Sequence, residues 1–156
     1  MTTNLKVNIA GIEMKNPILT ASGTYGFGEE YLDFYPPEIL GALVTKTIRL
    51  HEHPGNPTPR VAEAPAGLIN AVGIPSKGLD YFIKNDVERL KKLNVPIIQS
   101  IVGVTFDDYI ILTEKLSELN FLAAIELNLS CPNLGAGGLD LGLDHEAVYK
   151  FIKDIR

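Results

Sequence analysis

Polar residues follow four short apolar runs of the sequence, and their types are those that bind and activate small ligands. They occur as Ala21-Ser22-Gly23, as Thr45-Lys46-Thr47, as Gln99-Ser100 and as Asn128-Leu129-Ser130-Cys131-Pro132-Asn133. If the four runs are parallel strands, these groups converge outside the carboxyl ends of the strands, where ligands of α/β proteins bind. The hydroxyls, amides, ammonium and thiol suit a small polar ligand with a negative group, but they do not identify a reaction.

Lys46 is the only Lys or Arg that we expect at these four strand ends. It follows the apolar run that contains Leu43 and Val44. An ammonium group in such a place is costly unless it meets an anion. A lysine at a strand end can equally lay its apolar stem along the surface and keep its charge in water. The sequence leaves both interpretations open.

Serine and asparagine at the other positions have an ordinary explanation in turns. Ser22 beside Gly23 is typical of a turn, although the glycine would also let a flat cofactor approach the backbone. Asn70, Asn128 and Asn133 each offer an amide donor and acceptor, which suits the edge of a pyrimidine ring. For any one asparagine considered singly, a turn cap is the favoured interpretation.

Cys131 is the single cysteine of the chain. A free cysteine is most often a small buried hydrophobic residue. As a thiolate it could instead remove a proton from a substrate, because a free thiol has a pKa of about 8.5 that local charges shift readily. One cysteine and three scattered histidines do not have the spacing of a metal site, so we expect no metal.

The elements that carry these residues follow a βαβ rhythm. We expect a hairpin of residues 7–10 and 12–14, and then strands over 18–21, 43–47, 97–101 and 122–127. We expect helices over 29–34, 80–93 and 106–119, the last capped by Thr105, and a final helix that Asp144 caps. The Pro- and Gly-rich segment 51–78 has no helical period and is expected to be a long functional excursion.

These elements predict an α/β fold of the (β/α)8 TIM-barrel family. The chain would supply about the first four βα units, after an N-terminal β-hairpin, as part of a single domain over residues 1–156. A complete barrel takes about 250 residues, and half a barrel has two unpaired sheet edges. We therefore expect the remainder of the barrel to come from further polypeptide.

The composition is that of an ordinary soluble domain, with 46% hydrophobic and 21% charged residues. A formal net charge of -5 argues against a non-specific nucleic-acid surface or an anionic-membrane surface. The chain has neither a run of roughly 20 apolar residues nor a signal-peptide core at its start. We therefore expect a cytoplasmic protein, and the single cysteine, which cannot form an internal disulfide, agrees with a reducing compartment.

Five blocks of the sequence follow one another at a characteristic spacing. They are Asn16-Pro17-Ile18-Leu19-Thr20-Ala21-Ser22-Gly23-Thr24, Thr45-Lys46-Thr47, Gly55-Asn56-Pro57-Thr58-Pro59-Arg60, Asn70-Ala71-Val72-Gly73-Ile74 and Asn128-Leu129-Ser130-Cys131-Pro132-Asn133. Together they resemble the dihydroorotate dehydrogenases along the whole chain. Cysteine in the last block resembles class 1, and the stretch from Pro57 to Gly67 resembles its B type.

The resemblance implies roles for the matching positions. Cys131 would remove the C5 proton of dihydroorotate while a hydride leaves C6 for the flavin. Contacts with FMN would come from Ser22, Lys46, Thr47, Ser100 and Asn128, where many relatives have asparagine at the position of Ser100. Contacts with the substrate would come from Lys46, Asn70, Ala71, Val72, Gly73, Ile74, Asn128 and Asn133, with backbone contacts from Val72 and Ile74.

The resemblance also implies a reaction and partners. The parent enzyme would oxidise (S)-dihydroorotate to orotate in pyrimidine synthesis. It would form a homodimer and pair with a subunit whose FAD and iron–sulfur cluster pass electrons to NAD. The second half of the family's barrel supplies the phosphate site, so this chain alone is expected to be inactive. Two alternatives stay open, namely a related flavin barrel acting on another dihydropyrimidine and a non-catalytic half-barrel fragment.

Overall fold

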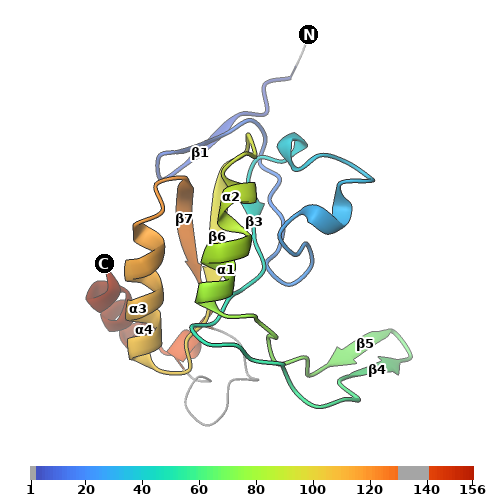
Figure 1. Ribbon diagram of the computed structural model, residues 1–156, viewed down its shortest axis with the longest axis vertical. Helices are drawn as coiled ribbons and strands as arrows, with labels where there is room; N and C mark the ends of the chain where they lie inside the picture. Colours follow the sequence, from blue (N-terminus) through green and yellow to red (C-terminus); the bar gives the residue numbers. More distant parts are fainter. Residues whose placement is uncertain (1–2, 130–140) are drawn as a thin grey trace.

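A three-stranded parallel sheet forms the centre of the molecule (Figure 1). A computed structural model describes residues 3–129 and 141–156 of the protein. The strand order is β3-β6-β7, with β3 at Leu43–Val44, β6 at Ile97–Ile101 and β7 at Leu122–Leu127. These strands are rich in Leu, Ile and Val, as is typical of parallel strands that are covered by helices. The predicted strands over 97–101 and 122–127 are confirmed.

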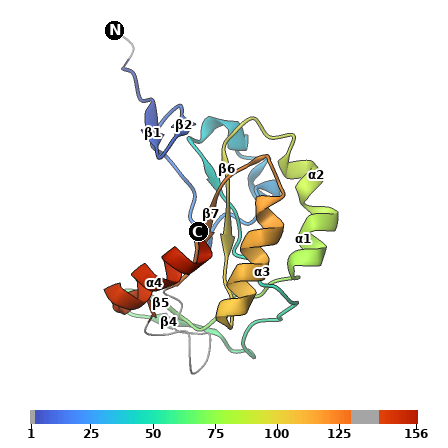
Figure 2. The ribbon, with the colours of Figure 1, turned by 90° about the vertical axis from the view of Figure 1, so that its left-hand side faces the viewer.

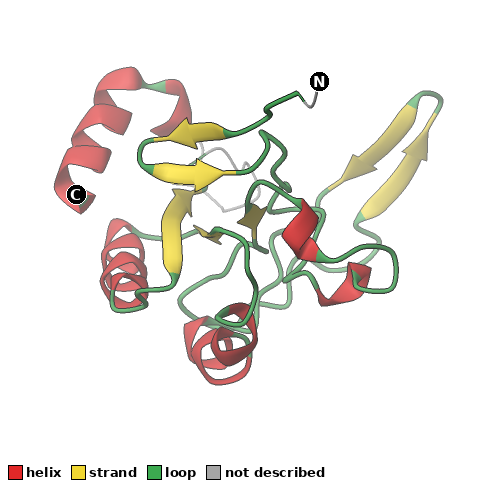
Figure 3. Cartoon of the chain, turned by 90° about the horizontal axis from the view of Figure 1, so that it is seen from above, coloured by secondary structure: helices red, strands yellow, loops and turns green. Residues whose placement is uncertain are grey.

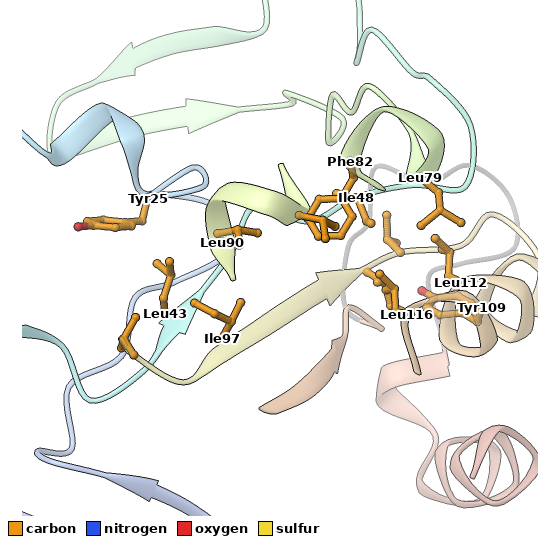
Figure 4. Packing of buried hydrophobic residues seen from close by; sticks show 14 of the residues in the cluster. Tyr25, Leu43, Ile48, Leu79, Phe82, Leu90, Ile97, Tyr109, Leu112 and Leu116 are labelled. Carbon is orange, nitrogen blue, oxygen red and sulfur yellow. The ribbon is translucent and has the colours of Figure 1, made fainter. Parts of the chain in front are cut away.

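Three helices cover one side of this sheet (Figure 2). They are α1 at Leu79–Asn85, α2 at Val87–Leu90 and α3 at Phe106–Ser117. Their apolar side chains pack against Leu43 and Ile97, and the cluster includes the fully buried Phe82 and Leu90 (Figure 4). Burying each such side chain contributes about 1.5–3 kcal/mol, so this face of the sheet holds the core.

The helix caps that the sequence predicts are confirmed. Thr105 Oγ1 accepts a hydrogen bond from the Asp108 N–H at 3.2 Å, and the Asp108 carboxylate accepts one from the Thr105 N–H. This reciprocal pair is a capping box, which stabilises the start of α3. The carboxylate of Asp144 likewise caps α4, which spans His145–Ile155, after the short 3₁₀ turn Leu141–Leu143. α4 packs against α3 through the edge of Phe151.

The predicted helices over 80–93 and 29–34 differ from the observed ones. The first is divided into α1 and α2 at Asp86, where Asn85 and Asp86 are poor helix formers. The second is reduced to the 3₁₀ turn Glu29–Tyr31, and a further 3₁₀ turn forms at Pro37–Ile39. These two turns belong to a loop that Arg89 ties to α2 by donating a hydrogen bond to the Phe27 carbonyl.

The predicted first strand over 18–21 is wrong in extent. Only Leu19 forms a parallel bridge, with Ala42. The Thr20 hydroxyl explains the difference, because it accepts a hydrogen bond from the Val44 N–H at 2.9 Å and donates one to the Val44 carbonyl at 2.8 Å. A side chain therefore takes the place of the backbone ladder at this edge of the sheet.

Two antiparallel hairpins flank the sheet. The predicted N-terminal hairpin is confirmed as β1 at Val7–Ile9 and β2 at Ile12–Met14. The excursion 51–78 contains a second hairpin, β4 at Val61–Ala64 and β5 at Gly67–Asn70, which the sequence patterns did not predict. It projects from the body of the molecule (Figures 1 and 3). Its apolar residues are exposed, which is why no inside–outside alternation marks it in the sequence.

No helix in the described parts of the chain is long and apolar enough to cross a membrane.

Candidate active site at the strand ends

The buried polar and charged side chains of the described residues are concentrated in one place. They lie in the carboxyl-terminal half of β6 and in the segment that follows β3. They are Thr45, Thr47, Arg49, Gln99 and Ser100, each no more than 6% exposed. Burying polar groups costs free energy unless each one is hydrogen-bonded. Such a concentration at the carboxyl ends of parallel strands is typical of an active site.

Lys46 lies in a bulge of the sheet. Val44 pairs with Ile98 and Ile48 pairs with Ile101, so three residues after β3 face only two of β6. The backbone of Lys46 leaves the ladder, since its N–H donates to the Gly26 carbonyl at 2.8 Å. Bulges redirect side chains and are common beside active sites. The predicted strand over 43–47 is therefore wrong beyond Val44, and this is the cause.

Gln99 holds the bulge together from the neighbouring strand. Its amide donates to the Lys46 carbonyl at 3.0 Å and to the Ser100 carbonyl at 2.7 Å. Its side-chain oxygen accepts from the Thr45 hydroxyl at 2.7 Å. The amide is fully buried, so each of these bonds forms in a low-dielectric environment. A polar group left without a hydrogen bond there would lower the free energy of unfolding.

The ends of β6 and β7 are fixed in a similar way. The hydroxyls of Thr47 and Ser100 are hydrogen-bonded to each other at 3.0 Å. The Asn128 N–H donates to the Ile101 carbonyl at 2.9 Å, and the Asn128 carbonyl accepts from the Tyr109 hydroxyl at 2.7 Å. α3 therefore helps to place the residue that follows β7.

The segment Asn70–Ile74 is held from two sides. Asn56 donates through its side chain to the Ala71 carbonyl at 2.8 Å and through its backbone to the Val72 carbonyl at 3.0 Å. On the other side, Arg49 donates to the carbonyls of Gly73 and Ile74. The expected substrate segment is thus tied to the end of β3 within three residues of Lys46.

The structure places the predicted site residues in three groups. Lys46, Thr47, Ser100 and Asn128 lie together at the carboxyl ends of β3, β6 and β7. Val72, Gly73 and Ile74 are half-buried or buried in the clamped segment, whereas Asn70 and Ala71 are exposed at the end of the projecting hairpin. Ser22 is half-buried, after the Leu19 bridge. Cys131 and Asn133 lie outside the described residues.

Sequence reasoning missed Arg49, and it placed Gln99 among the polar strand ends without predicting that its amide holds the backbone of Lys46. The expectation that Lys46 is the only Lys or Arg at the strand ends is wrong, because Arg49 is buried just beyond the same strand. A cation between Ile48 and Leu50 was the available signal, and it is the same signal that singled out Lys46. For Gln99 the strand-end position was recognised, but no signal in the sequence shows that its amide is buried and bonded to a neighbouring segment.

A cavity of about 440 Å³ borders the strand ends without containing the substrate segment. Lys46, Thr47 and His53 line it together with aromatic side chains, but none of residues 70–74 does. Burial and, secondarily, the charge of Arg49 lower the pKa of His53 below 6.5. Burial also raises the pKa of Asp86, which lines the same cavity, despite the nearby Arg89. Of the predicted site residues that the structure describes, only Lys46 and Thr47 line the cavity.

Within the described ranges, no three or more His, Cys, Asp and Glu side chains are grouped as metal ligands.

Comparison with known proteins agrees with the motifs. A family model described as dihydroorotate dehydrogenase matches residues 4–156. A protein of Desulforudis audaxviator is 44% identical over 156 residues, which cover 100% of this chain and 51% of that protein. Proteins of Geotalea uraniireducens and Malacoplasma penetrans are each 41% identical, over 98% and 97% of this chain and 50% of their own lengths.

All three relatives are described as the catalytic subunit of dihydroorotate dehydrogenase B (NAD(+)). The chain spans about half the length of these relatives. The resemblance to the B type of class 1 is therefore confirmed. With a family model matched over nearly its full length, the chain belongs to the dihydroorotate dehydrogenase family.

Proposed function

We propose that the complete enzyme to which these residues contribute oxidises (S)-dihydroorotate to orotate in pyrimidine synthesis. The residues would form the N-terminal half of its (β/α)8 barrel. The observation that carries the proposal is the concentration of buried polar side chains at the carboxyl ends of β3 and β6 in a member of this family. The shared description of the relatives supports the same reaction.

The donors at the strand ends fit FMN. Lys46, Thr47 and Asn128 offer an ammonium, a hydroxyl and an amide, which match the carbonyl and N–H groups along the edge of a flavin. A Cβ atom added at Gly23 would meet nothing within 4 Å, so a flat ring has room to approach the backbone there. Ser22 and Ser100 would complete the contacts, with Ser100 fixing the hydroxyl of Thr47.

When bound, FMN would accept the hydride that leaves C6 of the substrate. Cys131 would take the proton from C5 as a thiolate. Lys46 would place its charge beside the substrate carboxylate and the flavin. The orotate ring would be held by Asn70, Asn128, Asn133 and the segment from Ala71 to Ile74.

The words "catalytic subunit" and "NAD(+)" in the relatives' descriptions support a second subunit. In our proposal the complete enzyme is a cytoplasmic homodimer, and its partner carries FAD and an iron–sulfur cluster that deliver electrons to NAD. The 156-residue chain alone would turn over dihydroorotate negligibly, because the phosphate site of such barrels follows the seventh and eighth strands.

The test uses the full-length protein. Dihydroorotate should bleach its flavin absorbance in rapid mixing, and dihydrouracil should do so far more slowly. Cys131→Ser should slow bleaching by at least about a hundredfold, the usual contribution of a positioned base, and leave orotate binding nearly unchanged. A preference for dihydrouracil would favour the alternative dihydropyrimidine substrate. A full-length protein without flavin, or one that binds neither pyrimidine, would overturn the proposal.

A further inference from the structure

Arg49 is a buried cation to which no role has been assigned. It follows the bulge at Lys46 and is 6% exposed. Its Nε donates to the Ile74 carbonyl and its Nη2 donates to the Gly73 carbonyl, each at 3.1 Å. The flat guanidinium therefore bridges two successive carbonyls through two different nitrogens, and its rigid fork fixes their relative direction.

The backbone at these two carbonyls adopts a conformation that is rare for side chains other than glycine. Gly73 has φ 77° and Ile74 has φ 50°. For a β-branched residue a positive φ is a genuine outlier, and it persists only where the surroundings impose it. Strain of this kind is concentrated at functional sites.

The contacts around the segment show what imposes this conformation. Asn56 approaches from one side so closely that a Cβ atom at Gly73 would lie 2.7 Å from its side chain. Arg49 approaches from the other side, and its own N–H donates to the Ser76 hydroxyl at 3.0 Å. The turn at Gly73 and Ile74 is thus clamped between Asn56 of the excursion and Arg49, which precedes the excursion and supplies the charged side of the clamp.

The geometry of a trans peptide links this clamp to the ligand. The carbonyl and the N–H of one peptide unit point in opposite directions. Because the Gly73 carbonyl points at Arg49, the N–H of Ile74, which belongs to the same peptide unit, points away from Arg49. Ile74 is one of the residues whose backbone would contact the substrate, so Arg49 controls the direction of that contact.

We propose that Arg49 is a positioning residue for the substrate. Its guanidinium holds the Gly73 and Ile74 carbonyls so that the Ile74 N–H faces the bound pyrimidine, and it acts through this turn rather than by touching the ligand. The inference rests on the proposed function for the identity of the ligand. The clamp itself rests on the contacts of Arg49.

Two substitutions in the full-length protein distinguish the effect of the guanidinium geometry from the effect of its charge. Arg49→Lys keeps the charge but replaces the planar fork, in which two nitrogens each bond one carbonyl, with a single nitrogen. Arg49→Gln removes the charge as well. Both should raise the Kd of orotate and the KM of dihydroorotate by about tenfold or more, with kcat within about threefold. Wild-type affinity in Arg49→Lys would overturn positioning by the fork.

Arg89→Lys is the matched control. Arg89 also donates to a loop carbonyl, that of Phe27, at 2.9 Å, and it pairs with Asp86 and Glu29. Its substitution should lower the melting temperature without changing the Kd of orotate. An equal rise of Kd in the control would mean that any loosened loop has this effect, and would count against a specific role for Arg49.

A rescue variant keeps the proposal testable if the single variants fold poorly. Glycine adopts a positive φ without strain, so adding Ile74→Gly to Arg49→Lys should restore part of the stability and of the orotate affinity. No recovery of either would contradict the clamp.

Hydrogen exchange of residues 71–76 supplies a readout that needs no ligand. Arg49→Lys should speed exchange in this segment relative to wild type, and unchanged protection would overturn the clamp. If the wild-type protein does not bind orotate, the proposed function fails, while this measurement still decides the role of Arg49 in the turn.

Discussion

The two halves of the central strands are built from different chemistry. At their start, Leu43 and Ile97 are at most 1% exposed and pack against the fully buried Leu90. At their end, Thr45 and Gln99 are equally buried but are held by hydrogen bonds. The sheet is therefore stabilised by apolar packing at one end, and at the other end a polar network is added to the buried Ile48 and Ile101.

The difference shows how the sheet can support a site. Apolar packing tolerates small adjustments of geometry, whereas a hydrogen-bonded network fixes directions and penalises each missing partner. The bulge that redirects Lys46 lies between Val44 and Ile48, where the hydrogen-bonded network begins. Stability and ligand binding should therefore respond separately to substitutions in the two halves.

The largest expected effect on stability lies in the apolar half. Leu90→Ala should lower the free energy of unfolding of the full-length protein by about 2–5 kcal/mol, because it removes buried contacts and leaves a cavity. The Kd of orotate, measured well below the melting temperature, should stay within about twofold of wild type. Leu68→Ala, at a side chain that is 68% exposed, is the control and should change stability by less than about 0.5 kcal/mol. A large loss of affinity in Leu90→Ala would abolish the distinction between the halves.

Lys46→Ala should give the opposite pattern. The side chain is half-buried at the bulge, and its charge would meet the substrate carboxylate and the reduced flavin. Losing a charge-assisted hydrogen bond costs about 1.5–3 kcal/mol, so the Kd of orotate should rise about 10- to 100-fold. The flavin midpoint potential should also fall, because the reduced, anionic flavin loses a stabilising charge. Wild-type values of both would leave Lys46 with a structural role only.

Gln99→Leu should affect both properties, because Gln99 joins the network to the bulge. The variant leaves the Lys46 carbonyl and the Thr45 hydroxyl without their partner, which should cost about 1–3 kcal/mol of stability. Orotate should bind more weakly because the bulge is no longer held. Thr45→Val is the matched control, since it removes the bonds of the Thr45 hydroxyl to Gln99 and Ile98 but keeps the bond from Gln99 to the Lys46 carbonyl. If Gln99→Leu loses stability with orotate affinity intact, the network does not position Lys46.

Much of this organisation could be predicted from the sequence, for physical reasons. Periodic apolar residues and local caps predicted β6, β7, α3 and α4, because these signals lie within a few residues of each other. The isolated bridge at Leu19 and the bulge at Lys46 depend on side-chain bonds between distant segments, from Val44 to Thr20 and from Gln99 to Lys46. Such long-range side-chain bonds leave no periodic trace in the sequence.

For the predicted site, too, the long-range side-chain bonds could not be predicted from the sequence. Motif blocks located Lys46, Thr47 and Asn128, which the structure brings to neighbouring strand ends. The bonds that hold the site residues in place come from Arg49, which lies outside the motifs, and from Gln99, whose strand-end position did not reveal its partners. Side chains that act through the backbone of other residues are recognised only when their partners are known.

The smallest expected effect concerns His53 and tests whether the polar half extends into the excursion. Burial and then the charge of Arg49 lower its pKa below 6.5. Because the folded state disfavours the imidazolium, His53 should reduce stability as the pH falls below 6.5.

Arg49→Gln should raise this pKa, yet keep it below 6.5, because burial remains the larger cause. Arg49→Lys, which keeps a charge, should raise it less. NMR titration of the imidazole, assigned by its loss in His53→Gln, would measure both shifts. If the pKa of His53 is unchanged in Arg49→Gln, the charge of Arg49 does not affect the imidazole. The polar network would then be confined to the strand ends.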